Sequence, residues 1–185
     1  LLLETGRDAY ARPHLESLFK SNPEDSFPRK QLAILYRRWG EWESLLPFAW
    51  REYRESGGRE QLIDLSQILV KTGRSQKAGE LLLQRMIRDP FDHSTEKALE
   101  NLYPAMPDLK VTWERLKPQA TDAMYQAQIA SLSTQLKNKP DDSALVKQRA
   151  EVYLWQGNPK KALADLLTVR KDFSRNRPLI ARAVD

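Results

Sequence analysis

The amino-acid sequence predicts an all-α protein, an α-solenoid of stacked antiparallel helix pairs with no β-sheet. Through most of the 185 residues, apolar side chains recur at the i, i+4, i+7 and i+8 spacing of one helix face. Gly6, Gly40 and Gly73 precede successive helical patterns and recur at intervals of about 34 residues, the length of a two-helix repeat. No segment combines alternating β-branched residues with hairpin signals, so the sequence predicts no strand.

Two further series of residues share this period. Pro23, Gly57 and Pro90 each follow one of the three glycines at the same distance, half a repeat further along the chain. Pro13 and Pro47 are separated by one full repeat. Three series of turn-forming residues with one period indicate an internal helical repeat.

Five helices are expected before residue 90. Each has one apolar stripe, which in the first includes Ala11 and Leu15. Gly40 and Gly73 are expected to end the second and fourth helices, and Ser75 to cap the start of the fifth. The expected elements are the last turn of a truncated helix over residues 1–6, and helices over 7–20, 26–39, 41–55, 59–71 and 76–88.

The next segment departs from the period. Gly157 follows Gly73 at more than two repeat lengths, and the extra residues lie between positions 93 and 138. Pro118 is expected to break this segment, because proline lacks a backbone N–H and disrupts a helix interior. The expected elements are a helix over 94–103, a short helix over 111–116 and a full helix over 121–137.

The clearest repeat is the segment 143–173, which predicts two helices joined by a turn at 157–159. Small residues, Ala150 and Ala162, stand where the two helices must approach closely. Tyr153 and Leu166 are large enough to fill the space between them. A further helix is expected from residue 177 to the end of the chain.

These repeats resemble the tetratricopeptide repeat (TPR), a helix–turn–helix unit of about 34 residues. The family pattern has a small residue and a Tyr on the first helix, a Gly near the turn and a small residue opening the second helix. The matching residues are Ala150, Tyr153, Gly157 and Ala162 in the last repeat, and Leu32, Ala33, Tyr36, Gly40 and Trp42 in the second.

The resemblance implies one right-handed superhelix over residues 1–185. Its expected parts are a partial repeat over 1–25, repeats over 26–58 and 59–92, a degenerate repeat with an inserted short element over 93–142, a repeat over 143–176 and the start of a further helix over 177–185. The repeats at both ends are incomplete, so we expect the chain to be a piece of a longer protein. The apolar residues exposed at these incomplete repeats favour weak self-association of this piece.

The resemblance also implies a non-catalytic scaffold that binds another protein, or neighbouring domains of the same protein, on its concave face. Ten residues would lie on that face: Lys30, Ile34, Arg37, Arg38, Gln67, Lys71, Lys147, Glu151, Leu154 and Trp155. Five of them are cationic, which favours an acidic partner, although an ordinary solvated helix face would look the same. The alternative function is a structural spacer or docking segment of a larger assembly, such as a bacterial envelope or polysaccharide-export machine.

Trp155 has two interpretations that the sequence does not separate. It lies away from the Tyr153 face, so it is either an exposed aromatic binding anchor or a packing residue against the irregular segment. Trp39 shares this ambiguity, whereas Trp42, Trp50 and Tyr53 are expected in the core or between repeats.

The sequence shows no pattern typical of an enzyme. It has no cysteine, and we find no Gly-rich phosphate loop, nucleophile elbow or zincin motif. His14 and His93 lie in different repeats, so no metal site or other cofactor is expected. Asp141 and Asp142 look like paired carboxylates but fall at a repeat boundary, which favours a turn and helix cap.

The charge and hydropathy of the chain limit its partners further. The net charge is +5, and between residues 146 and 182 nine cations stand against three anions. Because these cations are scattered over several helix faces, nucleic-acid binding is not expected. No apolar run approaches the roughly 18 residues that span a bilayer, so no membrane insertion by this segment is expected, and the compartment, cytoplasm or bacterial periplasm, stays open.

Overall fold

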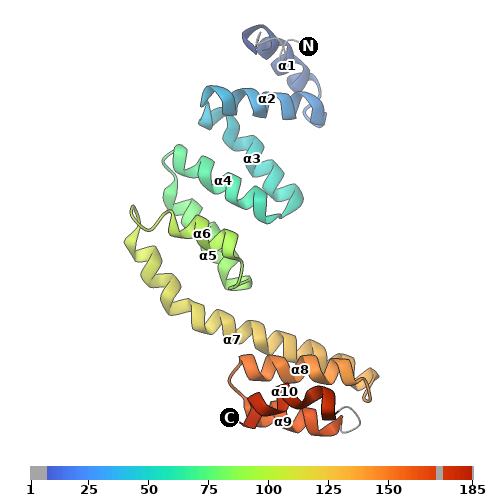
Figure 1. Cartoon of the computed structure of the whole chain (residues 1–185). Helices are drawn as coiled ribbons and strands as arrows, with labels where there is room; N and C mark the ends of the chain where they lie inside the picture. Colours follow the sequence, from blue (N-terminus) through green and yellow to red (C-terminus); the bar gives the residue numbers. More distant parts are fainter. Residues whose placement is uncertain (1–7, 170–172, 185) are drawn as a thin grey trace. The chain divides into compact units, whose positions relative to one another are not determined.

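The computed structural model describes residues 8–169 and 173–184, and in these residues it is all-α, with ten helices and no strand (Figure 1). The predicted all-α class is therefore confirmed. The expected turn over residues 1–6, with its Gly6 marker, lies outside the described residues. The helices are α1 (Asp8–Ser21), α2 (Ser26–Trp39), α3 (Trp42–Ser56), α4 (Arg59–Lys71), α5 (Ser75–Arg88), α6 (His93–Glu100), α7 (Pro107–Asn138), α8 (Ser143–Trp155), α9 (Pro159–Thr168) and α10 (Phe173–Val184).

Most predicted helix ends are confirmed, and glycine explains two of them. Gly40 ends α2 at φ +70°, and Gly157 follows α8 at φ +75°, a left-handed conformation that a residue with a side chain rarely adopts. The predicted cap at Ser75 is wrong. The Ala78 N–H donates to the Arg74 carbonyl at 3.2 Å, so Arg74 precedes the helix and Ser75 is its first residue.

The segment around Pro118 is the largest difference from the prediction. Two helices separated at this proline were expected, but α7 is one helix of 32 residues with Pro118 inside it. An interior proline costs about 3 kcal/mol because it removes a hydrogen bond and its ring crowds the carbonyl of Glu114. Trp113 and Ala120, on either side of it, are 3% and 6% exposed, so their burial offsets this cost and keeps the helix continuous.

Two other helix ends differ from the prediction. Helix α6 ends at Glu100 and a series of turns follows to Ala105, whereas the helix was expected to reach Tyr103. Helix α10 begins at Phe173, before the predicted start at residue 177.

At the start of α8 the Asp142 side chain accepts the backbone N–H groups of Ala144 and Leu145, which confirms its predicted role as a cap.

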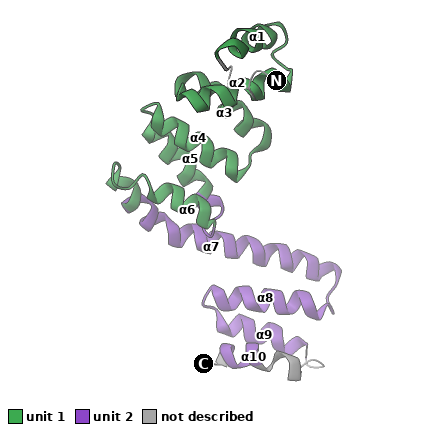
Figure 2. Cartoon of the chain, turned by 45° about the horizontal axis from the view of Figure 1, so that its top comes forward, with its two compact units in different colours: residues 1–85, 92–110 green, residues 86–91, 111–185 purple. Residues whose placement is uncertain are grey.

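The chain divides into two compact units, residues 1–85 with 92–110 and residues 86–91 with 111–185 (Figure 2). In the first unit α1 packs on α2, α2 on α3, α3 on α4, and α4 on α6. The fully buried side chains there are mainly leucines, among them Leu32, Leu35, Leu45, Leu62, Leu65 and Leu99. These packed helices thus bury apolar side chains against their neighbours.

An ion-pair network joins the first three helices of this unit. Arg12 of α1 donates to Glu16 and to Glu41, which precedes α3, at 2.7 Å each. The Tyr36 hydroxyl of α2 donates to Glu16 at 3.3 Å. The hydrogen bond from Arg12 holds the pKa of Glu16 below its ordinary value, which keeps the carboxylate charged. The Arg12 guanidinium also lies 5.5 Å from the Trp39 ring, so Trp39 has a packing role.

In the second unit α8 packs on α9, and α10 packs on both. Ala150 and Ala162 are fully buried there, Leu166 is nearly so, and Tyr153 packs against this cluster. The prediction that small residues mark a close helix–helix contact is therefore confirmed.

Arg149 holds three helices of the second unit together. It donates to both carboxylate oxygens of Asp165 in α9, at 2.8 and 2.7 Å, and to the Ser133 hydroxyl of α7 at 3.0 Å. The hydrogen bonds to Asp165 raise the pKa of Arg149 above its ordinary value. A forked guanidinium–carboxylate pair has a defined geometry, so this contact orients α9 on α8.

Replacing Ala150 with leucine is expected to destabilise the protein. The fully buried site has no room for a larger side chain, and overpacking of this kind costs about 1–3 kcal/mol. Ala144→Leu, at an exposed position of the same helix, is the matched control and is expected to stay within about 0.5 kcal/mol of the parent. Urea unfolding measures both, and equal stabilities would contradict the close contact.

Removing the charge of Arg149 is expected to leave Asp165 buried without its partner. Arg149→Met should lower the free energy of unfolding by about 2–3 kcal/mol, because a buried unpaired carboxylate is costly. The double variant Arg149→Met/Asp165→Leu should recover most of that loss. Urea unfolding of the parent, both single variants and the double variant gives the coupling energy, and additive effects would show that the pair does not act as a unit.

Candidate binding surfaces

The first candidate surface is a hollow on the exposed side of α2, which we call the α2 hollow. The opposite side of α2 buries Leu32, Leu35 and Tyr36, so the remaining positions face solvent. The α2 hollow has a volume of about 570 Å³. Its lining residues are Lys30, Ala33, Ile34, Arg37, Arg38 and Glu52. The structure thus brings together four of the ten residues predicted for a binding face.

The charges of the α2 hollow are mostly basic. Three of its lining residues are cationic and one, Glu52, is acidic. Arg37 donates to Asp64 of α4 at 2.6 Å, so part of its charge is already compensated. Gln67 and Lys71 are exposed one turn apart on α4 and do not line the α2 hollow.

The four predicted residues of α8 do not share one environment. Leu154 packs against the Ala150–Ala162 core and contributes no exposed anchor. Lys147 is half-buried, whereas Glu151 and Trp155 line a hollow between α7 and α8. Leu154 therefore differs from the prediction, because α10 covers the side of α8 on which it lies.

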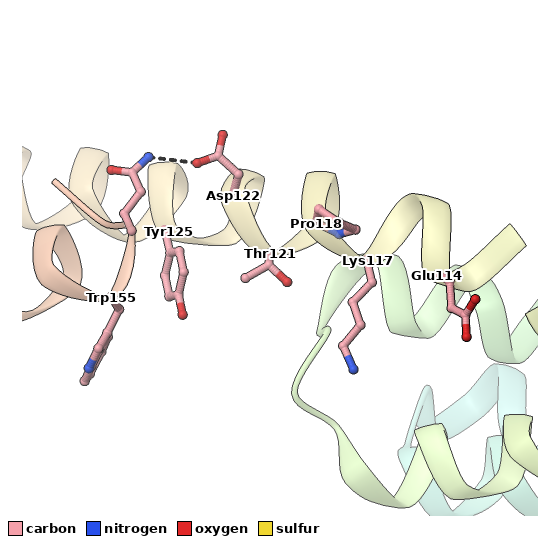
Figure 3. A pocket seen from close by; sticks show the side chains of 8 residues that line it. Glu114, Lys117, Pro118, Thr121, Asp122, Tyr125 and Trp155 are labelled. Atoms are coloured by element: carbon pink, nitrogen blue, oxygen red, sulfur yellow. Dashed lines mark hydrogen bonds between the residues drawn. The ribbon is translucent and has the colours of Figure 1, made fainter. Parts of the chain in front are cut away.

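Trp155 is the centre of the second candidate surface. Its side chain is 54% exposed and lines three adjacent hollows. One of these hollows lies along α7 and has a volume of about 400 Å³. The side chains of Tyr125 and Trp155, which both line it, point in the same direction (Figure 3). At its edge the Gln156 side-chain amide donates to Asp122 at 2.8 Å.

Three aromatic rings form a row at this place. The centroids of Phe91 and Tyr125 are 6.1 Å apart, and those of Tyr125 and Trp155 are 6.5 Å apart. We call this row, with the flanking carboxylates of Asp89, Asp122 and Glu151, the Trp155 surface. Trp155 therefore packs against Tyr125 of the irregular segment and is also more than half exposed, and its role as a binding anchor stays a prediction.

Phe91 and Tyr125 were not among the predicted site residues. Phe91 lies in a predicted turn, and Tyr125 lies in the predicted helix over 121–137, which the sequence did not place against α8. The signal in the sequence was Tyr125 itself, a large aromatic residue in the predicted helix over 121–137.

Asp92, a buried carboxylate in the described part of the chain, belongs to the fold. Asp92 caps α6, and accepts the Thr95 N–H at 3.2 Å and its hydroxyl at 2.9 Å. Arg59 and Arg85 lie 3.5 Å from its oxygens. Burial alone would raise the pKa of Asp92, but the hydrogen bonds from Thr95 and the two guanidinium charges outweigh it and hold that pKa below its ordinary value.

Comparison with protein-family models and with curated proteins finds no match for this chain. Among the described residues, no group of three histidine, aspartate or glutamate side chains is arranged to hold a metal ion. The helices of the described part include none with the length and apolar character needed to cross a bilayer.

The depressed pKa of Asp92 predicts a specific loss of stability in acid. A carboxylate with a lowered folded-state pKa contributes stability above its unfolded pKa, about 3.9, and loses it as the pH falls through the folded pKa. The free energy of unfolding should therefore fall between about pH 5 and pH 2 by more in the parent than in Asp92→Asn. Urea unfolding at several pH values measures the difference, and parallel curves would contradict it.

Proposed function

We propose that this chain is a non-catalytic scaffold of TPR-like helix pairs that binds another protein through the exposed side of α2. The observation that carries the proposal is the α2 hollow, where Lys30, Ile34, Arg37 and Arg38 gather. Ile34 is 49% exposed between cationic side chains, an arrangement that offers an apolar contact surrounded by charge. Interfaces commonly combine an apolar centre with a polar rim.

The charge of the α2 hollow favours a partner segment that carries carboxylates. Lys30 and Arg38 add positive charge to the exposed side of α2, and Lys71 is an exposed cation on α4. Guanidinium and ammonium groups form charge-assisted hydrogen bonds with carboxylates, and their summed potential steers an acidic segment toward the hollow. The type and position of these residues therefore support an acidic partner.

Reversing two exposed cations is expected to weaken binding of an acidic segment. A labelled oligoglutamate peptide is the probe, and its affinity for Lys30→Glu/Arg38→Glu, two exposed residues that line the hollow, should fall by about tenfold or more at low salt, because attraction becomes repulsion. Fluorescence anisotropy measures the affinity, and circular dichroism checks that the helix content is unchanged.

The matched control is Lys20→Glu/Lys97→Glu, which changes the net charge equally at exposed positions that do not line the α2 hollow. This control should bind oligoglutamate nearly as tightly as the parent. Equal weakening by both double variants would show that only the overall charge matters, and would remove the support for a specific site.

A further inference from the structure

Trp155 occupies an unusual place for a large aromatic residue. It is the last residue of α8, and its side chain lines three hollows of the second unit. An indole that packed only for stability would be covered, but more than half of this side chain is exposed. Exposed aromatic residues grouped in one place mark interaction surfaces more often than scattered ones do.

The neighbouring rings extend the exposed area. Phe91 is 46% exposed, and its ring contacts Tyr125, which in turn contacts Trp155. The interplanar angles of 41° and 34° show that the rings are tilted against each other and not stacked face to face. The faces of such rings carry negative potential and attract cations.

Carboxylates surround this row of rings. Asp89 lines the hollow beside Phe91 and Tyr125, Glu151 lies one helical turn before Trp155, and Asp122 lies at the edge of the hollow along α7. Within the described residues, none of these three carboxylates forms an ion pair with a basic side chain.

Among the residues that line the three hollows, four carboxylates stand against one cation, Lys117: Asp89, Glu114, Asp122 and Glu151. The guanidinium of Arg149, on the same helix as Glu151, is already paired with Asp165. The Trp155 surface is thus acidic, although the chain as a whole carries a net charge of +5.

Aromatic faces beside carboxylates match one side chain better than any other. A guanidinium is planar and stacks on aromatic rings, while its N–H groups donate to carboxylates. An ammonium group forms the same ion pair without the planar stacking. An acidic segment would be repelled, and a purely apolar one would desolvate Asp89 and Glu151 without compensation.

We propose that the Trp155 surface binds an arginine-bearing segment of a partner protein, with a guanidinium stacked on Trp155 or Tyr125 and paired with Asp89 or Glu151. This site has the opposite charge to the α2 hollow and belongs to the other unit. It therefore does not depend on the function proposed above, and each of the two proposals can fail without the other.

The test uses the full chain and labelled peptides of equal length rich in arginine, lysine or glutamate. Fluorescence anisotropy at low salt should give tighter binding of the arginine peptide than of the lysine peptide, and Trp155→Ala should leave any binding of the glutamate peptide unchanged. Trp155→Ala should weaken binding of the arginine peptide by about tenfold or more, as expected for a central aromatic anchor. Asp89→Asn/Glu151→Gln should weaken it about threefold to tenfold, with a smaller effect at high salt.

Matched controls separate this surface from general effects. Phe27→Ala removes an exposed aromatic residue of α2, and Glu60→Gln/Asp141→Asn removes two exposed charges elsewhere. Both should leave the affinity for the arginine peptide within about twofold of the parent, the small effect expected of distant surface charges. Circular dichroism and urea unfolding establish that each variant is folded.

A second measurement does not depend on the folding of any binding-deficient variant. The indole N–H resonance of Trp155, assigned by its loss in Trp155→Phe, should shift when the arginine peptide is added to the parent protein and should stay in place with the glutamate peptide. Absence of a shift with the arginine peptide, or equal binding by Trp155→Ala and Phe27→Ala, would overturn the proposal. Concentration-dependent self-association that Trp155→Ala abolishes would instead assign the surface to a second copy of the chain, and would overturn it equally.

Discussion

Burial of one apolar stripe per helix against its neighbours is the constraint on which this structure depends. A helix with a single stripe has no stable place for it in water, so it must pack against another helix. The close contacts need small residues, and Ala150 and Ala162 meet this need without exposed surface. In the first unit leucines such as Leu35 and Leu65 fill the equivalent space and are fully buried. This packing requirement explains why apolar and small residues recur at regular intervals in the sequence.

Charged residues divide into two groups with different roles. Asp92 and Asp165 are buried, and their hydrogen bonds and guanidinium partners orient α6 and α9. Such pairs contribute to geometry more reliably than to net stability, because desolvation offsets much of their attraction. The charged side chains of the α2 hollow and of the Trp155 surface are more exposed than Asp92 and Asp165. This difference in burial separates the residues of the fold from the candidates for binding.

The two candidate surfaces differ in chemistry although both lie on helical scaffolds. The α2 hollow combines Ile34 with cationic side chains, and the Trp155 surface combines aromatic rings with carboxylates. Packed helices leave shallow hollows between their exposed sides, and the residues lining each hollow decide what it attracts. Packed helices can therefore present surfaces of opposite charge without any change in their packing.

The all-α class, most helix ends and the buried small residues could be predicted from the sequence alone, because apolar period and turn residues act locally. The grouping of Lys30, Ile34, Arg37 and Arg38 was expected from the resemblance to the TPR, and their spacing places them on one side of α2. The course of α7 through Pro118 could not be predicted, because burial of side chains on either side of the proline outweighs a local preference for a break. The Trp155 surface likewise required tertiary contacts, since its three rings come from separate segments that only packing brings together.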